Sequence, residues 1–158
     1  IEYFKSNSAK KKYGGGTTLE LSHEFDYFQW IFGKIKKVEF VKIKKISKLK
    51  IDSEDNSLII GRNDRTNFIF DLNFYSRVLK REIIVDAKNF SVKADLIKNR
   101  IEIFNNEKKK IINFKNNLNK TYIEQIKAIL NKNYQNLCTY FEGLELIKFI
   151  DNLKKKFT

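Results

Sequence analysis

The apolar residues between Thr17 and Phe32 recur with the 3.6-residue period of an α-helix. Two adjacent stripes follow from this period, one of Leu19, His23, Asp26 and Trp30 and the other of Leu21, Phe25, Phe28 and Phe32. Thr17 or Thr18 suits the N-cap, and Gly33 is placed to end the helix. The pattern predicts a helix over 17–33, preceded by a polar loop over 1–16 that ends in a glycine cluster.

The middle of the chain changes to the two-residue period of β-strands. Seven segments fit this pattern, namely 35–45, 57–61, 66–75, 81–86, 90–97, 100–104 and 109–114. The links between them are short and show no helical period, so an antiparallel arrangement is favoured over a parallel one. Asn105, Asn106 and Glu107 join the last two segments and suit a tight hairpin with left-handed residues.

Two further helices are predicted near the end of the chain, over 119–134 with Asn119 as a possible cap and over 140–156. The second has a wide apolar surface, which indicates burial on more than one side. We therefore expect an α+β fold in a single domain over 1–158. An open, mostly antiparallel β-sheet over 34–114 would carry helices packed on one face, with the two closing helices over 119–157.

The formal net charge of +13 has two interpretations. A basic surface favours nucleic acid or another anionic partner. Lysine, however, supplies 27 of the 32 basic residues, and Ile, Lys and Asn together make up 65 of the 158 residues, as an AT-rich coding sequence would produce. Proteins that read bases rely on the planar fork of arginine, so we expect no nucleic-acid partner.

The chain has no run of 18 apolar residues and no secretory signal pattern, so we expect no membrane partner. Its single cysteine, Cys138, has no partner for an internal disulfide, which favours a reducing, cytoplasmic location. The chain contains no methionine and begins at Ile1, which indicates a processed chain or a fragment.

The stretch from Gly14 to Asp26 carries the candidate chemistry. The three glycines Gly14, Gly15 and Gly16 precede the predicted helix and would let a ligand approach the backbone closely. Glu20 and His23 are three residues apart and would project from one helix face. A carboxylate beside an imidazole fixes its tautomer, which suits a base that takes a proton from a sugar hydroxyl. The alternative is that His23 is a structural residue of a partly apolar helix.

This stretch resembles the signature helix that opens the C-terminal domain of the Gfo/Idh/MocA oxidoreductases. That signature has a glycine run, an acidic residue, a histidine, an aspartate and an aromatic stretch that ends in glycine. In this chain the match falls on Gly14, Gly15, Gly16, Glu20, His23, Asp26 and the segment 30–33. Segments 44–57, with Asp52, Glu54 and Asp55, 70–98 and 139–153 are similar to later parts of the domain, in the same order.

The resemblance implies a two-domain enzyme that transfers a hydride between NAD or NADP and a hydroxyl carbon of a sugar or nucleotide sugar. It implies that His23 and Glu20 are catalytic and that Gly14, Gly15, Gly16 and Asp26 bind substrate. Two departures stand out: the acidic position is usually Asp, and Glu20 moves the carboxylate by about one carbon–carbon bond. Asp26 also has a structural alternative, as an acceptor for Trp30 or for nearby backbone.

The chain contains no GxGxxG loop, so the resemblance implies that the dinucleotide-binding domain is absent from it and that its cofactor-binding residues lie there. We therefore expect no tightly bound cofactor, no metal and no turnover by this chain alone. A homo-oligomer formed through the sheet is expected. The sequence variant further resembles a branch that acts on bacterial surface sugars. The alternatives are a basic module that binds nucleic acid or anionic glycan, and a purely structural dimerisation domain.

Overall fold

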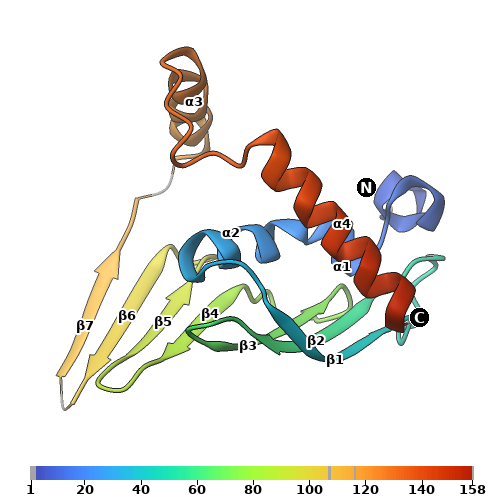
Figure 1. Cartoon of the computed structure of the whole chain (residues 1–158), viewed down its shortest axis with the longest axis horizontal. Coiled ribbons are helices and arrows are strands. Elements are labelled where there is room, and N and C mark those ends of the chain that lie inside the picture. The colour runs from blue at the N-terminus through green and yellow to red at the C-terminus, as the bar shows by residue number, and fades with distance from the viewer. Residues whose placement is uncertain (1–2, 107, 116, 158) are drawn as a thin grey trace. The chain divides into compact units, whose positions relative to one another are not determined.

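The computed structural model describes residues 3–106, 108–115 and 117–157, and they form two compact units. The first unit contains residues up to Tyr75 and from Cys138 onward, so both ends of the chain contribute to it. The second unit is the segment from Ser76 to Leu137. Figure 1 shows the elements of each unit, which are described separately below.

The first unit contains a three-stranded antiparallel sheet in the order β1-β2-β3. Its strands are β1 (Lys37–Lys44), β2 (Asn56–Arg62) and β3 (Asn67–Asn73). Three helices belong to the same unit, α1 (Thr17–Glu20), α2 (Ser22–Phe32) and α4 (Tyr140–Phe157). The polar segment before them forms three short 3-10 turns, η1 (Tyr3–Lys5), η2 (Asn7–Ala9) and η3 (Lys11–Tyr13).

The core of the first unit lies between one face of this sheet and α2 and α4. Its buried side chains are Phe25 and Phe28 from α2, Ile43 and Ile59 from the sheet, Phe68 and Phe70 from β3, and Leu146, Ile150 and Leu153 from α4. The aromatic rings pack edge to face, with centroids 4.6 Å apart for Phe25 and Phe70. On the opposite face Ile69 is 69% exposed, so the helices cover one side of this sheet, as predicted.

The second unit contains a four-stranded antiparallel sheet in the order β4-β5-β6-β7. Its strands are β4 (Glu82–Asp86), β5 (Ser91–Asp95), β6 (Arg100–Asn105) and β7 (Lys108–Asn113), and helix α3 (Leu118–Leu130) follows them. No residue of this unit is buried among those whose exposure the structure describes. Asn106, with φ of 49°, confirms the left-handed residue predicted for the β6–β7 hairpin, whereas Glu107 lies outside the described residues.

The α+β class and the antiparallel pairing are confirmed, but the expected single sheet is two sheets. The link between β3 and β4 is eight residues long, and each of these strands pairs only with its neighbour inside its own unit among the described residues. The helix expected over 17–33 is also divided, since Leu21, with φ of −101° and ψ of 25°, separates α1 from α2.

The two helix starts differ from the predicted caps. Gly16 occupies the N-cap position of α1, and the Thr18 amide and hydroxyl donate to the Glu54 carboxylate. Asn117, in place of Asn119, caps α3 by accepting hydrogen bonds from two backbone amides. Periodicity locates a helix end within a turn, but it does not reveal which side chain from elsewhere in the chain reaches that end. Gly33 ends α2 as predicted, with φ of 94°.

Candidate functional site

Helix α2 carries the only histidine of the chain in its first turn. The side chain of His23 is 49% exposed, while Phe25 and Phe28 on the other side of the same helix are buried in the core. The rigid packing of these two rings fixes the position of the helix. His23 is thus presented to solvent from an ordered element, which is the setting that a proton-transfer group requires.

A buried carboxylate holds the imidazole. Nε2 of His23 lies 3.0 Å from Oε1 of Glu24, whose side chain is 10% exposed. The Tyr27 hydroxyl donates to Oε2 of the same carboxylate. If Glu24 accepts from Nε2–H, the neutral ring carries its free lone pair on Nδ1, so Nδ1 is the atom that can take up a proton. The arrangement Tyr27–Glu24–His23 therefore sets both the orientation and the tautomer of the imidazole.

His23 lines a cavity of about 500 Å³ between α2 and the first half of α4. The α2 side is polar and supplies Ser22, His23 and Asp26. The other side is formed by Cys138, Tyr140, Gly143, Leu144, Leu146 and Ile147. A hollow with convergent polar groups on one wall and apolar groups on the other is the usual form of a small-molecule site. Its volume is sufficient for a ligand of several rings.

Asp26 faces Cys138 within this cavity. Burial, together with the hydrogen bond and negative charge of Asp26, raises the pKa of the Cys138 thiol to about 11. At neutral pH the sulfur is therefore a protonated donor, and nucleophilic chemistry, which needs the thiolate, is disfavoured. Asp26 thus contacts Cys138. It also lines the cavity, and its expected contact with substrate stays a prediction.

Glu20 does not share a continuous helix with His23. It is the last residue of α1, it is exposed, and the chain turns at Leu21 before α2 begins. The single helix expected to carry both Glu20 and His23 is therefore two helices, and a catalytic role for Glu20 stays a prediction. The carboxylate beside the imidazole is Glu24, which sequence spacing disfavours because neighbouring residues of a helix do not face each other.

The glycine cluster packs against other parts of the chain. A Cβ on Gly15 would lie 2.2 Å from the carbonyl oxygen of Ser8, and a Cβ on Gly16 would lie 2.3 Å from the carboxyl carbon of Glu54. Both glycines are buried. The close approach that a glycine run allows is thus used by the chain's own backbone and carboxylate. A substrate role for Gly14, Gly15 and Gly16 stays a prediction, and of the three only half-buried Gly14 could carry a Cβ without a clash.

The acidic loop before β2 fastens three segments together. Oδ1 of Asp52 accepts from the Lys11 amide at 2.6 Å. Oε1 of Glu54 accepts a hydrogen bond from the Thr18 hydroxyl at the start of α1 and lies 2.8 Å from Nζ of Lys154 in α4. Fully buried Asp55 accepts from Ile46 and Ser47. Burial raises the pKa of Asp55, but these hydrogen bonds outweigh it and hold that pKa below its usual value. The loop is structural, and its carboxylates are already engaged.

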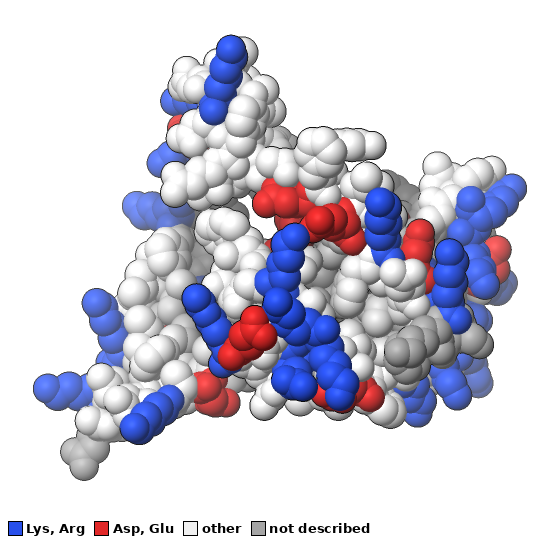
Figure 2. All heavy atoms as spheres, in the orientation of Figure 1, with Lys and Arg blue, Asp and Glu red and all other residues white. Residues whose placement is uncertain are grey.

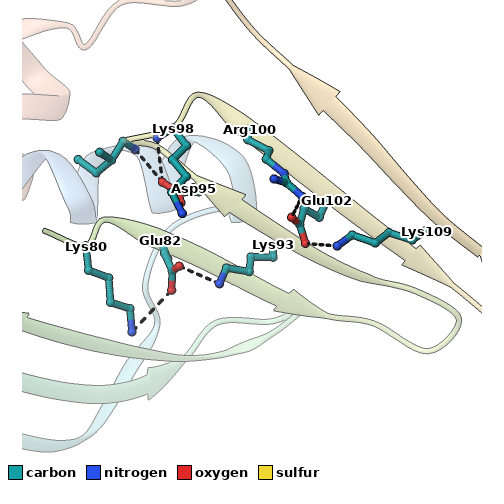
Figure 3. A network of polar contacts seen from close by, with 9 residues as sticks. Lys80, Glu82, Lys93, Asp95, Lys98, Arg100, Glu102 and Lys109 are labelled. Atoms are coloured by element: carbon teal, nitrogen blue, oxygen red, sulfur yellow. Dashed lines mark hydrogen bonds and ion pairs between the residues drawn. The ribbon is translucent and has the colours of Figure 1, made fainter. Parts of the chain in front are cut away.

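The second unit carries a network of ion pairs on strands β4–β6 (Figure 3). Each of three carboxylates on β4–β6 pairs with one or two neighbouring cations: Glu82 with Lys80 and Lys93, Asp95 with Lys98, and Glu102 with Arg100 and Lys109. The Lys93 hydrogen bond lowers the pKa of Glu82, and the Lys109 hydrogen bond lowers that of Glu102. These groups stay ionised at neutral pH, so none is poised for acid–base work.

Sequence reasoning missed Glu24, Tyr27 and Cys138 as neighbours of the site. Glu24 and Tyr27 are three residues apart on α2, and this spacing was available as a signal. Cys138 is 112 residues from Asp26 in the sequence, and only the return of α4 to the first unit brings them together.

No protein-family model and no curated protein matches the chain. Among the residues that the structure describes, no group of histidine, cysteine and carboxylate side chains could hold a metal ion. Within the same residues, no helix has the length and apolar character needed to cross a membrane. The site is therefore defined by its geometry, and the family resemblance remains a prediction.

Proposed function

We propose that this chain forms the substrate-binding side of an NAD(P)-dependent sugar oxidoreductase of the Gfo/Idh/MocA type. One observation carries the proposal: His23, oriented by buried Glu24, lines a cavity large enough for a sugar or nucleotide sugar. A hydroxyl group whose carbon gives up a hydride must also lose its proton, and a base within hydrogen-bond reach is needed for this step. His23 Nδ1 is the atom that we assign to it.

The other residues of the cavity receive supporting roles. Glu24 is a positioning residue that acts through His23, and Tyr27 holds Glu24. Ser22 and Asp26 offer a hydroxyl and a carboxylate for hydrogen bonds to sugar hydroxyls. In this proposal the NAD or NADP and a second proton-transfer group come from a dinucleotide-binding domain, because the chain has no phosphate-binding glycine loop of its own. The chain alone is expected not to turn over substrate.

The test uses the complete enzyme in which this chain is joined to its dinucleotide-binding domain. NAD(P)⁺ reduction is measured over a panel of nucleotide sugars. His23→Asn is expected to lower kcat by roughly 100-fold or more while substrate affinity is kept, since general-base catalysis contributes on the order of 10²–10⁴. Glu24→Gln is expected to give a smaller loss and a changed pH profile. Exposed Asp64→Asn is the control and should leave the activity unchanged.

Substrate contact is tested separately on the 158-residue chain. Nucleotide sugars are titrated into isotope-labelled protein, and the backbone resonances of Ser22, His23, Asp26 and Tyr140 are expected to shift together. Full activity of His23→Asn would assign His23 a structural role. Absence of NAD(P) reduction with every sugar, together with no shifts at the cavity, would overturn the proposal as a whole.

We also propose that two copies of the chain associate through the second sheet. Cross-strand pairing places seven apolar side chains on one face of that sheet, with Lys110 opposite Ile103 at its edge strand: Ile83, Val85, Val92, Ala94, Ile101, Ile103 and Ile112. All seven are partly exposed, and an apolar face that meets its own copy is self-complementary. Sedimentation from low to high concentration should show a dimer that Ile101→Lys breaks and exposed Ile84→Lys, on the opposite face, preserves. A monomer at every concentration would refute the pairing.

A further inference from the structure

A lysine patch lies at the end of the first unit where the N-terminal turns meet the loop after β1. The turns supply four of its lysines, Lys5, Lys10, Lys11 and Lys12. The loop supplies the other four, Lys44, Lys45, Lys48 and Lys50. Figure 2 shows basic side chains gathered at this end of the unit, over the turns and the β1–β2 connection. We use the name lysine patch for these eight residues.

Backbone contacts bring the two segments together although they are about 40 residues apart in the chain. The Lys11 amide donates to Asp52, and the Asp52 amide donates to the carbonyl of buried Ala9 at 3.3 Å. The patch is therefore built by the fold, which is why the even spread of lysine along the sequence does not reveal it.

Few acidic side chains lie beside these lysines. The sequence has no acidic residue from 3 to 19 or from 40 to 51. Nearby Glu54 and Asp55 are committed to internal hydrogen bonds. Within the part of the chain that the structure describes, Lys10, Lys11 and Lys12 form no ion pair, nor do Lys44, Lys48 and Lys50. A surface with this many like charges and few carboxylates, of which Asp52 is exposed, raises the local concentration of anions.

Exposed apolar side chains lie among these lysines. Phe4, Tyr13 and Ile46 are 42%, 55% and 55% exposed. The ammonium groups of Lys10 and Lys12 lie over the Tyr13 ring, 5.8 and 4.6 Å from its centroid, and that of Lys5 lies over Phe4. Lysine ammonium groups thus lie over the ring faces on which nucleic-acid bases would have to stack. Lysine charges beside exposed aromatic and aliphatic side chains fit the boundary between lipid headgroups and acyl chains.

We propose that the lysine patch docks the protein on an anionic phospholipid surface. The lysines attract the headgroups, and Phe4, Tyr13 and Ile46 enter the interface. This inference goes beyond the oxidoreductase proposal and does not depend on it, because it uses residues outside the His23 cavity. It replaces the sequence-based expectation of no membrane partner with peripheral binding, for which a membrane-spanning helix is not required.

The test is co-sedimentation of the 158-residue chain with vesicles of phosphatidylcholine alone or mixed with phosphatidylglycerol. Binding is expected only to the anionic vesicles and should fall with salt. Lys10→Gln, Lys11→Gln and Lys12→Gln together should weaken it on the order of 100-fold, since each lysine near such a surface contributes roughly a factor of five. The control removes the same charge elsewhere, by Lys108→Gln, Lys110→Gln and Lys120→Gln.

A second triple variant from the loop, Lys44→Gln, Lys48→Gln and Lys50→Gln, guards against misfolding of the N-terminal turns. It should reproduce the loss. Ile46→Ser should weaken binding without changing its salt dependence. Equal losses in the patch and control variants would show that net charge alone is responsible and would overturn the proposal. Binding to single-stranded or duplex DNA in the absence of binding to vesicles would overturn it in favour of a nucleic-acid partner.

Discussion

Asp55 illustrates how one buried carboxylate organises the region around it. It is fully buried and accepts hydrogen bonds from the amides of Ile46 and Ser47 and from the Ser47 hydroxyl. Burial raises the pKa of Asp55, yet the three donors dominate and leave it below its usual value. A carboxylate with a depressed pKa stabilises the fold at pH values above the unfolded-state pKa of about 3.9, and this contribution is lost as pH falls through the lower folded value.

Asp55→Asn is therefore expected to lower the free energy of unfolding at pH 7 by roughly 2–3 kcal/mol, because the amide cannot accept all three hydrogen bonds. The variant should also lose less stability than the parent between pH 5 and pH 2. Urea unfolding at a series of pH values measures both effects. Asp52→Asn, at an exposed position of the same loop, serves as the control. Equal pH dependence in the parent and Asp55→Asn would contradict this account.

Cys138 gives a second prediction for a single residue. Burial and the Asp26 carboxylate raise its pKa to about 11, so only about 0.1% of the thiol is ionised at pH 8. Asp26→Asn removes the negative charge but keeps the burial, and alkylation by iodoacetamide at pH 8 should accelerate by a factor of about 3 to 10. Asp71→Asn, at an exposed position of β3, is the control. An unchanged rate in Asp26→Asn would mean that Asp26 does not contact the thiol.

At the scale of elements, periodicity was sufficient to locate all seven strands and the main helices to within one to four residues at each end. It failed where a contact between distant segments decides the geometry. The capping of α1 by Glu54 depends on the loop before β2. The prediction placed His23 correctly on a helix but chose Glu20, whereas the carboxylate that contacts the imidazole is Glu24.

The three glycines before α1 allow backbone strain from a positive φ to be distinguished from a steric clash of an added Cβ. A Cβ on Gly14, which has φ of 81°, would make only an ordinary contact with Leu19 at 3.9 Å, so Gly14→Ala should cost only the left-handed strain of about 1–2 kcal/mol. Gly15 lacks a positive φ but faces the Ser8 carbonyl, so Gly15→Ala must displace backbone. Gly16 combines φ of 116° with the Glu54 contact. Thermal unfolding should rank Gly14→Ala as the mildest change and Gly16→Ala as the most severe. A milder effect of Gly16→Ala than of Gly15→Ala would mean that the Glu54 side chain moves away easily.

At the scale of the whole molecule, burial is concentrated in one unit. The first unit holds all the buried residues among those described, whereas the second has none. The sequence could not foresee this difference, because Ile83, Val92, Ile101 and Ile103 have the same alternating pattern as the strands of the first unit. Alternation shows which side of a strand is apolar, but it does not show whether anything covers that side.

Hydrogen exchange measures the consequence for local stability. β2 and β6 are both paired on two sides, yet only β2 adjoins a buried core. At low protein concentration the amides of β6 should exchange roughly tenfold faster than those of β2 or more, because local opening exposes little additional apolar surface. Protection in β6 should rise with concentration if copies pair through this sheet. Equal protection of both strands at all concentrations would contradict the division into a buried and an uncovered unit.

The first unit is interrupted by the second, and this has a consequence for synthesis on the ribosome. Phe25, Ile43 and Ile59 are made before the second unit, but Leu146, Ile150 and Leu153, which complete the same core, are made only after it. Until α4 leaves the exit tunnel, α2 alone covers the apolar face of the first sheet. Folding of the first unit is therefore delayed until α4 has been made, and chaperones that bind exposed apolar strands should engage the nascent chain during this interval.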